Sequence, residues 1–192
     1  MPFWKSRGAP DARSSALADA QRFEADLAAA RTTGDSDAQA RSAIFLGEAR
    51  FRAGDLDGAA AAFQQVADAA VNEAYSGCAR SNLFVVARDS GDRETARGHL
   101  MQAARCGPAW AATSCATMRV EGWEDDARAA ATAALTRAGD SSGATGWTSL
   151  SEQLTEMGMF DESAQALQKA SEATLALRPA ADQLAAGDVG GA

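Results

Sequence analysis

Residues 43–66 read AIFLGEARFRAGDLDGAAAAFQQV, and this stretch predicts two short α-helices that meet at Gly54-Asp55. Glycine readily adopts the left-handed backbone conformation that ends a helix, and an aspartate side chain accepts hydrogen bonds from the free amides that begin the next one. Alanine and glycine stand where the two backbones must approach each other. The stretch therefore predicts a helix-turn-helix unit.

The same turn recurs along the chain. Its glycines, Gly54, Gly91, Gly122 and Gly158, are 37, 31 and 36 residues apart, an average of 104/3 or just under 35. A period of this length, with one helical pair in each copy, indicates stacked helical repeats in which each pair buries its apolar face against its neighbours.

The repeats resemble the tetratricopeptide repeat (TPR) family over residues 40–177. The unit of that family begins with Trp, carries Leu three residues later and Gly next, and continues with a turn Gly, a small Ala, an aromatic residue and a closing Pro. The matching residues are Trp147 at the first position, Leu46, Leu83 and Leu150 at the second, Gly47 at the third, Ala59, Ala96 and Ala127 after the turn, then Phe63 and Pro108. The third repeat departs from the pattern, since Ser114 stands at its Leu position.

The resemblance implies an all-α fold, an α-solenoid of about four TPR-like helix-turn-helix repeats. The alanine-rich run at 11–33 matches no repeat, and we expect an extra N-terminal helix there that packs on or caps the first repeat. Residues 1–10 are predicted to be a flexible arm, and residues 178–192, which end in GDVGGA, a disordered tail. An irregular helical bundle is the alternative architecture.

Composition excludes several classes of function. The net charge of −8 argues against nucleic-acid binding, because phosphates require a basic surface. No apolar run approaches the roughly 18 residues that a membrane span needs, so no membrane partner is expected. Three cysteines form no disulfide framework, which favours a reducing compartment, and we expect a cytoplasmic protein.

TPR arrays bind peptides in the concave groove that the first helices of their repeats form, and this geometry implies a partner-binding groove here. The residues expected to line it are Arg41, Ile44, Glu48, Phe51 and Arg52 from the first repeat, Ser81, Val85 and Arg88 from the second, Ala112 and Arg119 from the third, and Thr148, Glu152 and Thr155 from the fourth.

Arg88 and Arg119 take equivalent positions in adjacent repeats. Because guanidinium groups bind carboxylates bidentately, two stacked arginines could hold an acidic peptide or a chain terminus. The alternative is that they pair with the neighbouring Asp89 or Glu121 and stay solvated.

The sequence holds no recognisable catalytic or metal-binding motif, so we expect neither an enzyme nor a cofactor. His99, Cys78, Cys106 and Cys115 have spacings that match no zinc motif. No Ser-His-Asp arrangement is visible beyond the lone His99, and no glycine-rich loop is placed to hold a phosphate.

Two hypotheses of function remain. The first is a non-enzymatic adaptor or scaffold that binds a protein or peptide partner in the groove. The alternative is a self-associating structural module, such as a homodimer, in which exposed apolar turns or the first helix pack against another copy. Measuring the size of the protein at two concentrations separates them, because self-association follows mass action.

Overall fold

The structure, a computed structural model, describes residues 10–136 and 143–187, and every regular element in these ranges is helical. The elements are α1 (Pro10–Thr33), α2 (Ser36–Ala53), α3 (Leu56–Ala69), α4 (Glu73–Asp89), α5 (Arg93–Ala103), the 3₁₀ turn η1 (Ala104–Cys106), α6 (Pro108–Val120), α7 (Glu124–Leu135), α8 (Gly143–Glu156) and α9 (Phe160–Gly187). The all-α helical-repeat class predicted from the sequence is confirmed.

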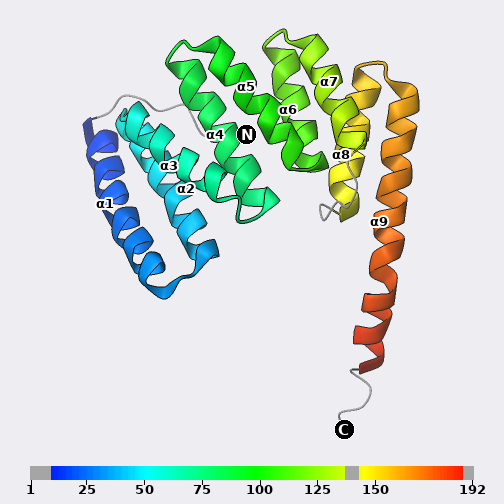
Figure 1. The fold of residues 1–192 in the computed structure, drawn as a ribbon, viewed down its shortest axis with the longest axis horizontal. Coiled ribbons are helices and arrows are strands. Elements are labelled where there is room, and N and C mark those ends of the chain that lie inside the picture. The colour runs from blue at the N-terminus through cyan, green and yellow to red at the C-terminus, as the bar shows by residue number, and fades with distance from the viewer. Residues whose placement is uncertain (1–9, 137–142, 188–192) are drawn as a thin grey trace. The chain divides into compact units, whose positions relative to one another are not determined.

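Local chemistry accounts for the helix boundaries. All four predicted turn glycines have positive φ angles, for example +83° at Gly54 and +84° at Gly91. The side chains of Asp55 and Asp92 then accept hydrogen bonds from the amides of Gly58 and Thr95, at 2.9 and 3.0 Å, and so begin α3 and α5. These glycine–aspartate turns make each pair antiparallel (Figure 1).

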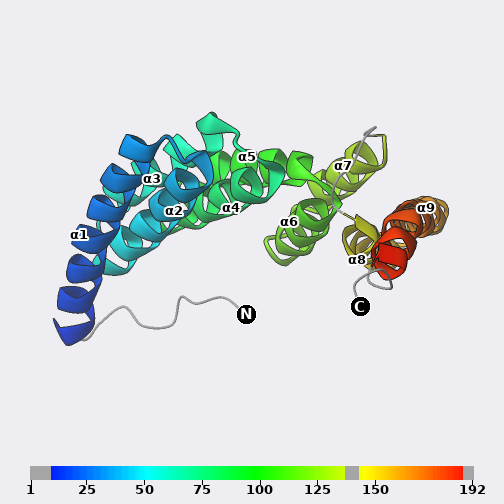
Figure 2. The same cartoon turned by 90° about the horizontal axis from the view of Figure 1, so that it is seen from below.

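The chain divides into two compact units, Met1–Cys106 and Gly107–Ala192. In the first, each helix from α1 to α4 packs against the next one, and α2 also contacts α4 (Figure 2). In the second, α6 packs against α7 and α8, and α8 against α9. The division falls inside the stretch 40–177, for which the sequence predicted one repeat domain. Gly107 and Pro108 stand at it, and they break the helix that precedes them.

The two ends of the chain differ in how they relate to the prediction. The extra N-terminal helix is present as α1, which begins at Pro10 and pairs with α2. Residues 1–9, expected as a flexible arm, lie outside the described residues, as do residues 188–192 at the end of the expected tail. The helix α9, however, continues to Gly187, so residues 178–187 are helical where a disordered tail was expected. Alanine and leucine, both strong helix formers, dominate this stretch.

The ring of Phe63 packs directly against Gly47 in the core of the first unit. Phe63 is 1% exposed, and a Cβ atom added at Gly47 would lie 2.6 Å from its ring. Only glycine leaves room for this ring at that distance. The small residue that the repeat pattern places at position 47 is therefore a packing requirement.

Replacing Gly47 with alanine is expected to lower the free energy of unfolding by about 1–3 kcal/mol, because the ring of Phe63 must move within a packed core. Gly98→Ala in α5 is the matched control, since a Cβ atom there meets nothing within 4 Å. It should instead stabilise the helix by up to about 1 kcal/mol. Urea denaturation followed by circular dichroism measures both, and equal effects of the two substitutions would contradict the contact.

Candidate functional site

The predicted groove residues are divided between the two units. Those of the first and second repeats lie on α2 and α4, which contact each other, and those of the third and fourth lie on α6 and α8, which also contact each other. Each unit therefore brings its own set together. The continuous groove over four repeats, and the joint use of Arg88 and Arg119, stay predictions because the two residues belong to different units.

Several of the predicted residues are unsuited to meeting a partner. Ile44 is 6% exposed and Ala112 is 5% exposed, so both belong to the core and the expectation that they line a groove is corrected. Phe51 is half-buried and packs against the core of the first unit. The reason is that these side chains lie on the buried sides of α2 and α6.

The remaining predicted residues reach the surface at least in part. Arg41, Glu48 and Arg52 on α2 are exposed, as are Thr148, Glu152 and Thr155 on α8, while Ser81 and Val85 on α4 are half-buried. Burial raises the pKa of Glu48, and the charge of Arg52 opposes that rise. Arg52 itself donates to Asp19 of α1 at 3.2 Å.

The two arginines predicted to hold an acidic peptide have internal partners. Arg88 lies 3.5 Å from Asp89, and its guanidinium carbon is 5.3 Å from the ring centre of Phe84. Arg119 pairs with Glu156 of α8 and donates to Gln153 at 3.3 Å. The alternative named from the sequence, internal pairing, therefore describes both residues, although the acidic partner of Arg119 comes from the next repeat.

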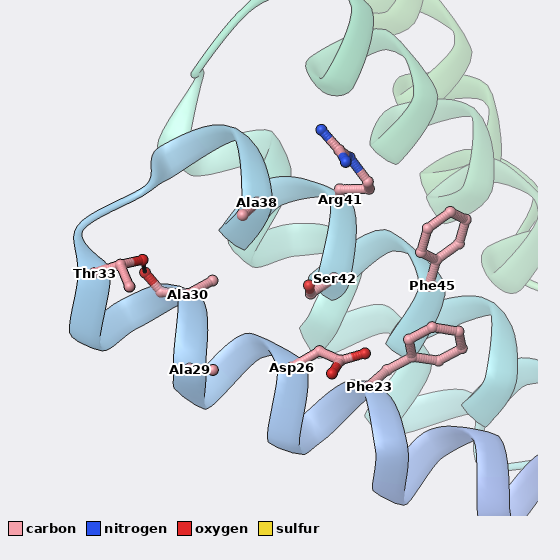
Figure 3. A pocket seen from close by; sticks show the side chains of 9 residues that line it. All are labelled: Phe23, Asp26, Ala29, Ala30, Thr33, Ala38, Arg41, Ser42 and Phe45. Atoms are coloured by element: carbon pink, nitrogen blue, oxygen red, sulfur yellow. Dashed lines mark hydrogen bonds between the residues drawn. The ribbon is translucent and has the colours of Figure 1, made fainter.

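A surface pocket of about 400 Å³ lies between α1 and α2, and we call it the α1–α2 pocket (Figure 3). Its lining consists of Phe23, Asp26, Ala29, Ala30 and Thr33 from α1 and Ala38, Arg41, Ser42 and Phe45 from α2. Alanines and two aromatic rings make most of this surface, and a carboxylate and a guanidinium supply opposite charges.

The two phenylalanines close one end of the pocket. Their ring centres are 5.3 Å apart and the ring planes are inclined by 32°. At this separation the two aromatic rings attract each other. The guanidinium carbon of Arg22 lies 4.5 Å from the ring centre of Phe23 and so covers that ring in part. Phe45 remains 42% exposed, which is unusual for a large apolar side chain on a helix whose other apolar residues form the core.

The charged side chains of the pocket are only partly compensated. The hydroxyl group of Tyr75 on α4 holds Arg41 by a hydrogen bond and raises the pKa of its guanidinium. The charges of Asp35 and Asp37 raise this pKa further, so they offset part of the charge of Arg41. Asp26 forms no ion pair with any residue that the structure describes, and Figure 3 shows it on the α1 side of the pocket. A ligand could therefore meet an oriented cation beside apolar surface.

The sequence identified Arg41 but missed Phe45, Phe23 and Asp26 as members of this site. A partial signal was present, because residues 44–46 are three consecutive large apolar residues, and one face of a helix cannot bury all three. The structure buries Ile44 and Leu46 and leaves Phe45 exposed.

The soft nucleophilic and basic groups of the chain are poor candidates for chemistry. Burial raises the pKa of Cys115 to about 12, and burial together with the charge of Glu48 raises the pKa of Cys78, so both thiols stay protonated near neutral pH. Within the described ranges, no three His, Cys, Asp or Glu side chains are grouped to hold a metal ion. Among the helices that the structure describes, none combines the length and apolarity of a bilayer span.

Acidification is expected to destabilise the protein through His99. Burial first, and then the charge of Arg80, lowers the pKa of this half-buried histidine from 6.5, while Asp92 opposes them, and its Nδ1 atom is buried without a hydrogen bond. The folded state binds this proton more weakly than the unfolded state does. The contribution of His99 to the free energy of unfolding is therefore fully present above about pH 6.5 and is lost as the pH falls from there toward the lowered pKa of the folded state. The slope of this loss is at most about 1.4 kcal/mol per pH unit.

Urea denaturation of the wild type and of His99→Gln between neutral and mildly acidic pH measures this effect. The variant should lose less stability than the wild type over that window. Parallel pH profiles of the two proteins would show that His99 does not contribute.

Comparison with known proteins assigns the chain to no family. Its packed helical pairs define a helical-repeat protein. No protein-family model matches the chain, and no curated protein matches it. Among solved structures it is similar to one described as the crystal structure of MamA, with a TM-score of 0.41 and 12% identity over 91% of this chain and 99% of that chain. A similarity this distant assigns neither a family nor a partner.

Proposed function

We propose that the protein is a non-enzymatic adaptor or scaffold, built of TPR-like repeats, that binds a segment of a protein partner in the α1–α2 pocket. The observation that carries the proposal is the combination of an exposed Phe45 with an exposed Arg41 at one hollow surface. Aromatic and arginine side chains supply most of the binding energy at protein interfaces when they surround a desolvated contact.

The chemistry of the pocket indicates what the segment should carry. An apolar side chain would cover the rings of Phe23 and Phe45 and the alanines of the floor, and an acidic side chain would reach Arg41. This replaces the predicted pairing of an acidic peptide with Arg88 and Arg119, whose internal ion pairs a ligand would have to break.

Substitutions in the pocket are expected to abolish binding without unfolding the protein. Phe45→Glu and Arg41→Glu should each reduce capture of the partner from native cell extract by at least about tenfold, since each removes one of the two main contacts and adds a charge. Both residues are exposed, so circular dichroism should show that the variants keep the helical content of the wild type.

Leu17→Glu is the matched control, because Leu17 is a large apolar residue on α1 that is 51% exposed and does not line the pocket. It should capture the partner as well as the wild type does. If the pocket variants retain the partner while an Arg88→Glu, Arg119→Glu double variant loses it, the binding site lies on the predicted arginines instead.

A further inference from the structure

The last helix exposes three large apolar side chains, Phe160, Leu167 and Leu175, and the earlier repeats bury the residue that stands at the position of Leu167. In successive repeats, the residues equivalent to Leu167 are Phe63, Leu100 and Ala131, spaced by the same 37, 31 and 36 residues as the turn glycines. Those three are at most 2% exposed, whereas Leu167 is 49% exposed. Phe160 and Leu175 are also exposed, by 69% and 57%.

Helical geometry places these three residues on one face. Leu167 follows Phe160 by seven residues and Leu175 follows Leu167 by eight, spacings that repeat after about two turns. We call this face the α9 stripe. It lies beside the buried face of the same helix, formed by Ser163, Ala166 and Ala170, and it has no partner helix among the described residues.

The α1–α2 pocket is the exposed surface of the first repeat in the sequence, as the α9 stripe is that of the last. The residues 37 positions after Ala38 and Arg41 are Tyr75 and Cys78 on α4, and both pack against the core cluster to which α1, α2, α3 and α4 contribute. A helix, α2, thus covers in the second repeat the positions that are open in the first. The α1–α2 pocket is therefore the place where a further helix would pack against the first repeat.

The length and charge of α9 suit it to binding in the α1–α2 pocket. It has 28 residues against 14 in α8, a difference that corresponds to about 20 Å of helix. Figure 1 shows that α9 extends beyond α8. Asp161 and Glu172 lie on one flank of the α9 stripe at helical spacing, where their carboxylates would face a cation beside an apolar surface. Arg41 is such a cation at the edge of the α1–α2 pocket.

We propose that the α9 stripe of one copy of this protein docks in the α1–α2 pocket of a second copy. This rests on the proposed function, because it names the partner of the same pocket, and it makes the contact head-to-tail. The two surfaces differ, so one contact leaves a free pocket and a free stripe, and further copies can add until a ring closes or a filament grows.

The test uses the full chain and two variants, Phe45→Glu in the pocket and the double variant Leu167→Glu, Leu175→Glu on the stripe. Analytical ultracentrifugation and light scattering should show that the mass of the wild type rises between micromolar and near-millimolar concentration. Each variant alone should remain at the 19.8 kDa of one chain. Mixed in equal amounts, they should form a discrete dimer of twice that mass, because the first retains its stripe and the second its pocket.

Leu17→Glu and Val120→Glu serve as matched controls in the two units, since both residues are exposed and belong to neither surface. They should assemble as the wild type does, and circular dichroism should show equal helicity for all variants. A wild type that stays monomeric at the highest concentration, or a mixture that stays monomeric, overturns the proposal. The wild type is then tested for capture of a different protein from native cell extract. If Phe45→Glu abolishes that capture, the proposed binding function still holds without self-association. If Phe45→Glu still captures that protein, both the proposed binding function and the self-association are wrong.

Discussion

Replacing Phe63 with alanine is expected to lower the free energy of unfolding of the first unit by about 3–5 kcal/mol, one of the two largest effects of a single substitution that we foresee. The side chain is 1% exposed and fills the space that Gly47 leaves open between α2 and α3. Removing the ring loses its burial and leaves a cavity, and glycine has no side chain that could move into it.

Urea denaturation followed by far-ultraviolet circular dichroism measures the loss as a lower midpoint. Gln64→Ala is the neighbouring control, because Gln64 is exposed on the same helix and its side-chain amide donates a hydrogen bond to Asp68 at 2.7 Å. That change should stay within about 0.5 kcal/mol of the wild type. A Phe63→Ala protein as stable as the control would mean that α2 and α3 are not packed as described.

Leu150→Ala should cost about 2–5 kcal/mol in the second unit. Leu150 is fully buried in α8, and the indole of Trp147, 3% exposed, lies on the same helix. Trp110, Trp123 and Trp147 all belong to the second unit, so denaturation followed by tryptophan fluorescence reports chiefly on this part of the chain.

Leu167→Ala provides the matched comparison, because it makes the same leucine-to-alanine change on α9, the helix that packs against α8. Because Leu167 is 49% exposed, its loss should change the stability of a single chain by no more than about 0.5 kcal/mol at low protein concentration. Comparable losses for Leu150→Ala and Leu167→Ala would show that Leu167 is buried, and the α9 stripe would not exist.

The positions of the helices could be predicted from the sequence because their signals are local. A glycine with positive φ followed by a capping aspartate ends one helix and begins the next through contacts within a few residues. The extra N-terminal helix was recognisable for a similar reason, since its alanine content favours helix in any context. The extension of α9 beyond Arg178 was missed, because a proline and a glycine-rich end outweighed the helix-forming residues between them.

The candidate site was only partly predictable, because exposure depends on neighbours that the sequence does not place. Three consecutive apolar residues at 44–46 could not all face the core, and only the packing of α1 and α3 against α2 decided that Phe45 is the exposed one. The ion pair between Arg119 and Glu156 joins α6 to α8 over 37 residues of sequence, a distance at which charge patterns give no guidance.

By itself, the sequence determined an all-α chain of helical pairs with turns at four glycines, because backbone conformation and capping are set by adjacent residues. Only the tertiary structure decided that equivalent positions in different repeats differ in solvent exposure. Phe63 and Leu167 occupy the same place in their repeats, yet one is buried and the other exposed, because α3 is followed by another helix that covers it and α9 is followed by none among the described residues. The repeat pattern is encoded residue by residue, whereas the exposed surfaces of α1–α2 and of α9 depend on how the helices of each unit pack.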